Sequence, residues 1–362
     1  MPIPFSDPRH WLDRVPQTLH ASPLYRAFWE QTKDDPELLA LLELVPKDQP
    51  LPITFFTAVN YLVLGEPHNP LLPFYPSSQP EQTRPATEVA PVFRAFVLDH
   101  REALQALLPT ARLQTNEVTR CANLLPAFLL AYRRGKQKAL NLLEIGSSAG
   151  LNLLWYRYGY RYRYEHEKQG LEDLRFNGVQ SPVQIQCQLN DVQPFPLTPT
   201  TALPRVARCE GIEICPRDLH NEQDMRWVRA AIWPEEVERQ RTLDAALALA
   251  RSVEVPVHKG DACDLLPELL AAMPLTHTAV VWHSFAVNQG PREVKELLHV
   301  QMAEASHQRP IYRIALEVEP AAPLPCLQLS EYQNGRMVSQ EVLAHCALHG
   351  ERMTWLADLP SL

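Results

Sequence analysis

Glycine is scarce in this chain, with 12 glycines among 362 residues against 34 prolines. Because glycine is rare, the places where it gathers indicate where the backbone needs its conformational freedom. Two of the twelve lie in the pentapeptide GSSAG, residues 146–150, and another lies at position 211 in CEGIE. These two stretches are the first candidates for a functional turn.

The chain also lacks an excess of positive charge, a long apolar run and a cysteine framework. Its 34 Lys and Arg residues against 42 Asp and Glu residues give a formal net charge of -8, which argues against a partner held through nucleic-acid phosphates. No apolar segment approaches the roughly 20 residues that a membrane span needs, and the stretch MPIPFSDPRHWLDR lacks the pattern of a secretory signal. Seven irregularly spaced cysteines favour free thiols in a reducing compartment. These absences predict a cytoplasmic protein with neither a nucleic-acid nor a membrane partner.

The first 137 residues are expected to form an all-helical domain with proline-rich connections. Ser22 and Asp35 each place a capping side chain before a proline at the first helical position. The segment 88–108 is amphipathic with the period of a helix. A last helix is predicted between Thr115, as its cap, and Gly135.

From residue 138 to 362, predicted strands alternate with predicted helices. This alternation is typical of an α/β fold in which helices cover both faces of a mostly parallel sheet, and such sheets bind ligands at the carboxyl ends of their strands. The segment SPVQIQCQL is a candidate hairpin partner for YRYGYRYRYEHE, and the final segment predicts antiparallel strands with a turn at Asn334-Gly335. Strands are expected at 140–146, 156–167, 181–189, 205–214, 276–285 and 309–319, a strand-turn-helix at 253–270, and helical segments at 151–158, 221–252 and 291–305.

The GSSAG turn fits the G-x-S-x-G elbow of serine hydrolases, with Ser148 as the nucleophile. In those enzymes several strands and an oxyanion loop precede the nucleophile, whereas the upstream third of this chain is predicted to be helical and has no HGG-like stretch. Candidate acids and bases downstream, such as Asp261 and His345, stand in no distinctive context. The hydrolase hypothesis is the least favoured.

The same turn is close to the glycine-rich turn that binds dinucleotides. The G-x-G-x-x-G pattern needs a bare second glycine near the pyrophosphate and a third for close helix packing. The equivalent positions here are Gly146, Ser148 and Leu151. The second glycine position carries the Ser148 side chain and the third carries the bulky Leu151. Both substitutions disfavour NAD as the ligand of this turn.

S-adenosylmethionine fits the turn better because it carries no phosphates. It requires backbone N–H groups for its carboxylate and acidic groups for its ammonium and ribose hydroxyls. Three successive predicted strands end in an acidic residue: Glu144, Glu213 and Asp261. We expect Glu213 to accept the ribose hydroxyls and Asp261 the adenine amino group. The alternative is that acidic residues gather at strand ends because those ends are solvated.

Four long stretches carry a family resemblance: QTNEVTRCANLLPAF, LLEIGSSAGLNLLWYRYGYRY, RCEGIEICPRDL and RWVRAAIWPEEVERQRTLDAALALA. They resemble a bacterial family of uncharacterised proteins that is assigned by fold to the class I S-adenosylmethionine-dependent methyltransferases. The resemblance implies a Rossmann-like methyltransferase sheet over 138–362, mostly parallel with an antiparallel C-terminal hairpin. It also implies insertions at about 159–205 and 221–252, and a helical lid or substrate-binding domain over 1–137.

The resemblance further implies which residues contact the cofactor. The first motif is matched by Glu144, Gly146, Ser147, Ser148 and Gly150, with Ser148 where many members have glycine. Glu213 matches the ribose-binding acid, although Asp is commoner there, and Asp261 with Ala262 matches the motif on the adenine side. VVWHSFAVNQG matches the fourth strand and its loop, without the Asn-Pro-Pro-Tyr signature of amino-directed nucleic-acid enzymes.

Further residues are candidates for catalysis and substrate contact. His283 ends a predicted strand, where a neutral histidine would serve as a general base, and Ser284 would contact the substrate. A hydrogen-bonded histidine at the sheet edge is the alternative, since in-line positioning alone can drive methyl transfer. Asn116 and Glu117 are expected as substrate contacts, or as parts of a capping turn.

Two patterns are interpreted without a ligand. The Tyr–Arg alternation is typical either of a stacking surface for nucleic acid or of a strand with tyrosines inside and arginines in water, and the net charge favours the second. Cys209 with Cys215, and His345, Cys346 and His349, lack the spacing of metal ligands, so no metal is predicted. The leading hypothesis is a methyltransferase acting on a small molecule or protein in a cleft between the two domains. A non-catalytic S-adenosylmethionine-binding sensor or scaffold is the alternative.

Overall fold

The computed structural model describes residues 19, 22–78, 81–166, 170–176, 180–190, 195–198, 201–319, 322 and 324–358. The chain divides into two compact units. A helical unit comprises Met1–Thr115 with His220–Arg241, and a sheet unit comprises Asn116–Leu219 with Thr242–Leu362. The domain boundary expected after residue 137 differs from this division, because α8 (Arg120–Arg134) packs against strands of the sheet.

The helical unit is built around aromatic side chains. Its helices are α3 (Pro23–Thr32), α4 (Pro36–Leu42), α5 (Leu51–Gly65), α6 (Ala90–Asp99), α7 (Arg101–Leu107) and α9 (Glu222–Ala230), with short 3-10 helices η1 (Leu72–Phe74), η2 (Ala86–Glu88) and η3 (Leu108–Thr110). Helix α5 is apolar on nearly every side, which suits a helix buried in a core. The ring of Phe28 stacks on that of Phe93, with centroids 4.1 Å apart. Trp227 of α9 belongs to the same core, which explains why residues 220–241 join this unit.

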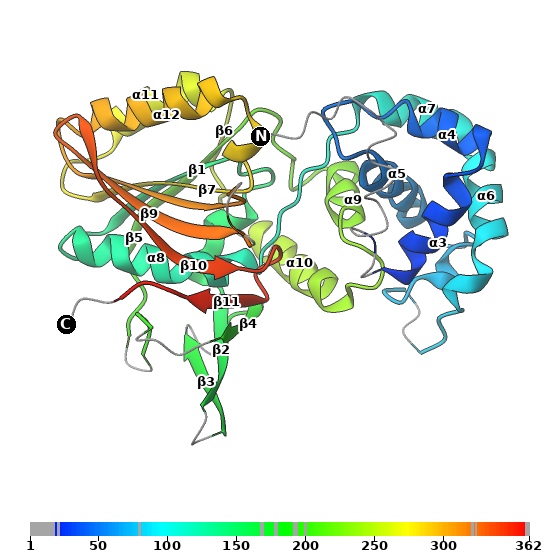
Figure 1. The fold of residues 1–362 in the computed structure, drawn as a ribbon, viewed down its shortest axis with the longest axis horizontal. Helices are drawn as coiled ribbons and strands as arrows, with labels where there is room; N and C mark the ends of the chain where they lie inside the picture. Colours follow the sequence, from blue (N-terminus) through cyan, green and yellow to red (C-terminus); the bar gives the residue numbers. More distant parts are fainter. Residues whose placement is uncertain are drawn as a thin grey trace. The chain divides into compact units, whose positions relative to one another are not determined.

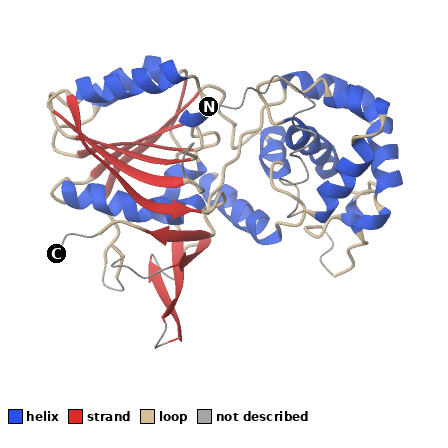
Figure 2. Cartoon of the chain, in the orientation of Figure 1, coloured by secondary structure: helices blue, strands red, loops and turns tan. Residues whose placement is uncertain are grey.

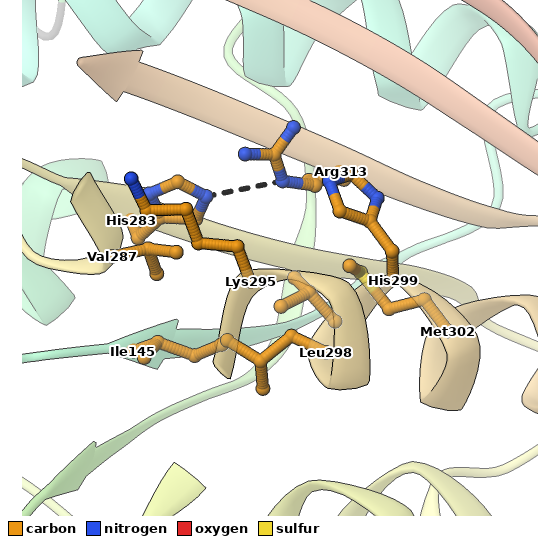
Figure 3. Close-up of a pocket in the computed structure, with 9 residues that line it drawn as sticks. Ile145, His283, Val287, Lys295, Leu298, His299, Met302 and Arg313 are labelled. Carbon is orange, nitrogen blue, oxygen red and sulfur yellow. Dashed lines mark hydrogen bonds between the residues drawn. The ribbon is translucent and has the colours of Figure 1, made fainter. Parts of the chain in front are cut away.

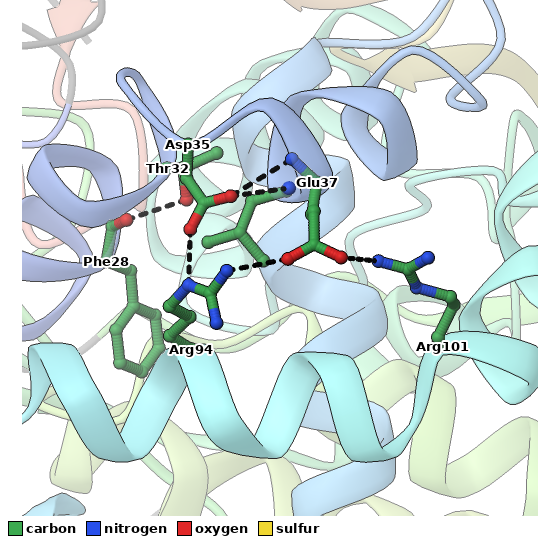
Figure 4. A network of polar contacts seen from close by, with 7 residues as sticks. Phe28, Thr32, Asp35, Glu37, Arg94 and Arg101 are labelled. Atoms are coloured by element: carbon green, nitrogen blue, oxygen red, sulfur yellow. Dashed lines mark hydrogen bonds and ion pairs between the residues drawn. The ribbon is translucent and has the colours of Figure 1, made fainter.

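The predicted helix caps of this unit are confirmed. The Ser22 hydroxyl accepts a hydrogen bond from the Tyr25 N–H at 3.0 Å, and Asp35 accepts from the first turn of α4. Figure 4 shows Arg94 joining Asp35 to Glu37, both at 2.6 Å. The segment predicted as one helix over 88–108 is two helices, since the backbone leaves helical geometry at His100, where ψ is 17°.

The described residues of the sheet unit form eleven strands that pair in one sheet. Figure 2 shows these strands in red. The strands are β1 (Leu140–Ile145), β2 (Gly159–His166), β3 (Gly170–Phe176), β4 (Gln184–Asn190), β5 (Val206–Glu213), β6 (Val257–Lys259), β7 (Thr278–Ser284), β8 (Ile311–Glu317), β9 (Cys326–Gln333), β10 (Arg336–Cys346) and β11 (Arg352–Trp355). Their order is β3-β2-β4-β11-β10-β9-β8-β7-β1-β5-β6. Six of the ten neighbouring pairs are parallel, so the predicted mostly parallel α/β sheet is confirmed.

The full strand order is not that of a typical Rossmann sheet. Five neighbouring strands are parallel and lie in the order β6-β5-β1-β7-β8. If these five alone are numbered along the chain, their spatial order is 3-2-1-4-5. This matches the first five positions of the classic Rossmann order 3-2-1-4-5-6. At the next position stands β9, antiparallel to β8, and β10, β11, β4, β2 and β3 extend the sheet beyond it. Helices α11 (Ala262–Ala272) and α12 (Arg292–Ala305) lie on one face of the sheet and α8 on the other (Figure 1).

Two local predictions were wrong. The antiparallel partner of β2 is β3, and β4 pairs with β2 in parallel. The predicted hairpin fails because β3 lies between the two segments in sequence and takes the antiparallel position. Helix α8 begins at Arg120 with Thr119 as its N-terminal neighbour, so Thr115 does not cap it.

Other local predictions were confirmed. The turn between β9 and β10 lies at Asn334-Gly335, both in the left-handed region with φ of 51° and 79°, as a two-residue hairpin turn requires. In β2, Tyr160 and Tyr162 are buried, while Arg161 pairs with Asp173 of β3. The Tyr–Arg alternation is therefore a strand with its tyrosines inside.

Candidate ligand site at the carboxyl ends of the parallel strands

The GSSAG turn joins β1 to a 3-10 helix, η4 (Leu151–Arg157), through three left-handed residues. Gly146, Ser148 and Gly150 have φ of 77°, 53° and 74°. A left-handed conformation is uncommon for a residue with a side chain, so Ser148 holds backbone strain at a position that suits glycine. Strain of this kind gathers at functional sites.

The glycines of the turn are also needed for close packing. A Cβ on Gly146 would lie 2.4 Å from the Cβ of Ala286, and one on Gly150 would lie 2.5 Å from Cγ1 of Val255. Gly211, opposite Glu144 in the β1–β5 register, leaves room for the Ser147 side chain. Protein atoms thus occupy the space beside these three glycines, although Gly146 itself is exposed.

Glu213, at the end of β5, is bonded to the turn. Its Oε2 accepts a hydrogen bond from the Ser148 N–H at 2.8 Å, and its Oε1 accepts from the Cys215 N–H at 3.1 Å. The Ser148 hydroxyl accepts a hydrogen bond from Nδ2 of Asn116 at 2.5 Å. A hydrolase nucleophile requires a base, usually a histidine, hydrogen-bonded to its hydroxyl. Among the described residues, no histidine is hydrogen-bonded to the Ser148 hydroxyl.

Asp261 is exposed and caps helix α11. Its Oδ1 accepts a hydrogen bond from the Cys263 N–H at 2.8 Å, and Ala262 is the first residue of the helix. The Gly260 N–H donates to the Glu213 carbonyl at 3.0 Å. The ends of β5 and β6, with their acidic residues, are therefore neighbours at one edge of the sheet, and capping alone accounts for the local conformation of Asp261.

Glu144 and three neighbouring polar groups share one face of the sheet beneath the turn. Glu144 lies opposite Trp282 in the β1–β7 register, and Ser284 points the same way two residues later. Ser147 lies on the same face, over Gly211. Four side-chain atoms on this face are buried without a hydrogen-bond partner among the described residues: Oε2 of Glu144, Oγ of Ser147, Nε1 of Trp282 and Oγ of Ser284. Buried polar groups are nearly always bonded in folded proteins, so these four atoms retain hydrogen-bonding capacity that the described residues do not use.

The Glu144 carboxyl group is in an environment that favours its neutral form. It is 2% exposed. Burial, followed by the negative charge of Glu213, raises its pKa well above the usual value. A neutral carboxylic acid both donates and accepts hydrogen bonds.

His283 lies on the opposite face from Glu144, because it follows Trp282 in β7. Its Nδ1 is 2.6 Å from Oε1 of Glu317, and its Nε2 accepts a hydrogen bond from Nε of Arg313 at 3.1 Å. Burial, then the charge of Arg313, lowers the pKa of His283. The imidazole is thus neutral, with its proton on Nδ1 and both ring nitrogens engaged. Glu317 also accepts from the N–H groups of Ala286 and Val287.

The predicted substrate contacts lie just before α8. Asn116 reaches Ser148, whereas Glu117 is 4% exposed and accepts a hydrogen bond from the Thr119 N–H at 3.3 Å. The guanidinium of Arg120 stacks over the ring of Phe285, 4.0 Å from its centroid. Phe285 has a φ of 53°, so the loop after β7 also holds a strained residue.

Sequence reasoning missed Trp282, Phe285, Arg313 and Glu317. Glu317 ends β8 just as Glu213 ends β5, so extending the strand-end rule past β7 to β8 would have found it. The local sequence does not predict that Phe285 is left-handed or that the indole N–H of Trp282 lacks a hydrogen-bond partner among the described residues.

Helices followed by a mixed, mostly parallel sheet define an α/β protein. Residues 15–355 match the model of a family described as an uncharacterized protein conserved in bacteria (DUF2332), so the chain belongs to that family. None of the curated proteins and none of the solved structures compared with the chain matches it. In the described part of the chain, no helix is both long and apolar enough to cross a bilayer, and no three His, Cys, Asp or Glu side chains gather as metal ligands would.

Proposed function

We propose that the carboxyl ends of β1, β5, β6 and β7 bind S-adenosylmethionine and that the protein transfers its methyl group to a small-molecule or protein acceptor. The observation that carries the proposal is the set of four unpartnered buried groups on Glu144, Ser147, Trp282 and Ser284. Each unmade buried hydrogen bond costs about 1–3 kcal/mol. A polar ligand that satisfies them recovers this free energy.

The residues present match the polar parts of the cofactor. Glu144 offers oxygen acceptors for the ammonium, and the Trp282 N–H and Ser147 hydroxyl offer donors for the carboxylate. Glu213 would hold the ribose hydroxyls and Asp261 the adenine amino group, on the edge where such sheets bind ligands. The parallel order 3-2-1-4-5 of the adjacent strands supports the same placement. When bound, the cofactor supplies a methyl group made electrophilic by the sulfonium.

The role of the protein in this proposal is to position two reactants. Both ring nitrogens of His283 are already hydrogen-bonded, to Glu317 and Arg313, so neither is open to accept a substrate proton in this geometry. Holding the acceptor in line with the methyl group supplies much of the rate enhancement without a base. We propose that the methyl acceptor is contacted by Ser284, Asn116 and Glu117.

Calorimetric titration with S-adenosylmethionine, S-adenosylhomocysteine and NADH tests the cofactor. The sharpest variant is Asp261→Asn, because asparagine caps a helix as well as aspartate does while losing the charge that receives the adenine amino group. We expect binding of both sulfur nucleosides and about tenfold weaker binding by the variant, equivalent to about 1.4 kcal/mol. Glu341→Gln on β10, paired with Arg134, is the matched control and should bind normally. Binding of NADH alone would overturn the proposal.

A non-catalytic cofactor-binding protein is the second candidate, favoured by the shielded position of His283. Incubation with methyl-labelled S-adenosylmethionine and fractionated bacterial extract separates the two. Label transferred to a small molecule or protein, and reduced in Asp261→Asn at a cofactor concentration below its Kd, supports the enzyme. Tight binding with no transfer to any fraction supports a sensor or scaffold.

A further inference from the structure

The proposed methyl transfer has no base at His283, because this side chain faces the other side of the sheet. Figure 3 shows the His283 imidazole bonded to Arg313, in a small pocket that Val287 and Lys295 also line. A hydroxyl or amine acceptor loses a proton when it gains a methyl group, and a base placed for that proton contributes roughly 10²–10⁴-fold to the rate. A base for this reaction has to come from another side chain at the edge that holds the proposed site.

Strand β10 ends at this same edge of the sheet. β9 runs antiparallel to β8, and β10 runs antiparallel to β9, so β10 has the direction of the parallel strands β1, β7 and β8. Its carboxyl end therefore lies on the side where such sheets bind ligands. The turn that follows β10 is closed by a hydrogen bond from the Gly350 N–H to the Ala347 carbonyl at 3.2 Å, and it carries His349.

Backbone contacts hold this turn against the start of α8. Nε of Arg120 donates a hydrogen bond to the Leu348 carbonyl at 2.9 Å. Gly350 has a φ of 88°, and a Cβ at this position would lie 2.5 Å from the carbonyl carbon and oxygen of Thr119. The two backbones are therefore in close contact, and the position of His349 relative to α8 is fixed.

The imidazole of His349 lies beside a buried carboxylate. Its Nδ1 is 3.7 Å from Oε2 of Glu117, whose side chain is 4% exposed, whereas the His349 side chain is 41% exposed. Oε1 of Glu117 accepts a hydrogen bond from the Thr119 N–H at 3.3 Å. The 3.7 Å separation is longer than a hydrogen bond, as catalytic pairs often are before the substrate binds. A carboxylate beside Nδ1 favours the tautomer with its proton there, which leaves Nε2 as the proton acceptor.

Residues at the start of α8 connect this histidine to the proposed site. Asn116, next to Glu117 in the chain, donates a hydrogen bond to the Ser148 hydroxyl of the GSSAG turn. The Arg120 guanidinium stacks over the ring of Phe285 in the loop after β7. One short segment thus contacts the GSSAG turn, the loop after β7 and the turn that carries the histidine.

We infer that His349 is the general base of the methyl transfer and that Glu117 is its positioning residue, an inference that rests on the proposed function. Nε2 of the neutral imidazole takes the proton of an acceptor hydroxyl or amine, and a lone pair of the acceptor atom forms the bond to the methyl carbon. The bond from that carbon to sulfur breaks, and its electron pair stays on the sulfur. The Glu117 carboxylate stabilises the imidazolium until the proton passes to water. The acceptor is accordingly an oxygen or nitrogen nucleophile that carries a proton, not a thioether or a pyridine-type nitrogen.

Transfer and binding measured side by side test this assignment. His349→Gln should slow transfer of the label to the fraction that wild type methylates by about 100-fold, while its affinity for S-adenosylhomocysteine stays within about twofold of wild type. His345→Gln, in β10 itself, is the matched control and should keep the wild-type rate. A rate for His349→Gln within about threefold of wild type would overturn the assignment and leave the proposed function standing. If wild type binds neither sulfur nucleoside, or binds them without transfer to any fraction, the reaction itself is refuted and the base with it.

The tautomer of His349 gives a readout that needs no turnover. Ring nitrogen chemical shifts, measured above the titration range of histidine, should show the proton on Nδ1 in wild type. Glu117→Gln should weaken this preference and lower the transfer rate about tenfold. A wild-type ring that carries its proton on Nε2 would contradict the assignment. Because the His349 side chain is partly exposed, His349→Gln keeps the test valid if Glu117→Gln fails to fold.

Discussion

Glu144 and Trp282 lie directly opposite each other in the β1–β7 register, and each has a buried polar atom without a hydrogen-bond partner. Trp282 is fully buried, and its ring meets that of Phe128 of α8 edge-on, with centroids 5.4 Å apart. The indole ring is therefore closely packed, whereas its N–H has no hydrogen-bond acceptor among the described residues. Such a pair is expected where a fold reserves hydrogen-bonding capacity for a ligand.

Replacing Trp282 with phenylalanine removes the unpartnered N–H and keeps an aromatic ring. We expect the free energy of unfolding without ligand to stay within about 2 kcal/mol of wild type, because the lost ring volume is offset by removal of an unmade hydrogen bond. Affinity for S-adenosylhomocysteine should fall about tenfold. Urea unfolding and calorimetry measure the two effects. A large loss of stability with unchanged affinity would show that the N–H serves only the fold.

Glu144 should make stability depend on pH above the ordinary titration range of a carboxyl group. Its folded pKa is raised, so the folded state binds a proton that the unfolded state has released. The stability it contributes is present below the unfolded pKa and is lost as pH rises toward the folded pKa, with a slope of up to about 1.4 kcal/mol per pH unit. Glu144→Gln should flatten this slope in urea unfolding between pH 5 and 8. An unchanged slope would mean that Glu144 is ionised in the fold.

Ser148 should respond to substitution through its backbone. Ser148→Val should destabilise the protein by about 2 kcal/mol, because a β-branched residue is strained at a φ of 53°. Ser148→Gly relieves strain but loses the bond from Asn116, so we expect it to lie within about 1 kcal/mol of wild type. Thermal unfolding of the two variants measures the difference. Equal stability of Val and Gly variants would contradict the left-handed conformation.

Ser148 should also be unreactive toward a fluorophosphonate probe. Its side chain is 5% exposed, and its hydroxyl accepts a hydrogen bond from an amide instead of donating one to a base. Mass spectrometry of the labelled protein checks this. Labelling at Ser148 that disappears in Ser148→Ala would revive the hydrolase hypothesis.

The sequence predicted those features that depend on local rules. Caps at Ser22 and Asp35, the hairpin turn at Asn334-Gly335 and the strand before GSSAG follow from side chains and backbone conformations a few residues apart. The placement of Glu144, Glu213 and Asp261 at the ends of β1, β5 and β6 follows from the pattern of the strands. Such rules need no knowledge of the distant packing.

The remaining features depend on tertiary contacts. Sequence spacing could not show that His283 and Glu144 face opposite sides of the sheet, because that depends on the register between β1 and β7. It could not show that residues 220–241 join the helical unit, since Trp227 packs in a core formed by residues more than 100 positions earlier. The parallel pairing of β4 likewise depends on β3 having taken the antiparallel position.

A crystal structure with S-adenosylhomocysteine bound is the most direct test of the proposed site. We expect the ligand at the carboxyl ends of β1, β5 and β7, with its polar groups within hydrogen-bonding distance of Glu144, Trp282 and Glu213. A ligand bound elsewhere, or ordered waters that satisfy Glu144 and Trp282 while the ligand fails to bind, would contradict the proposed function.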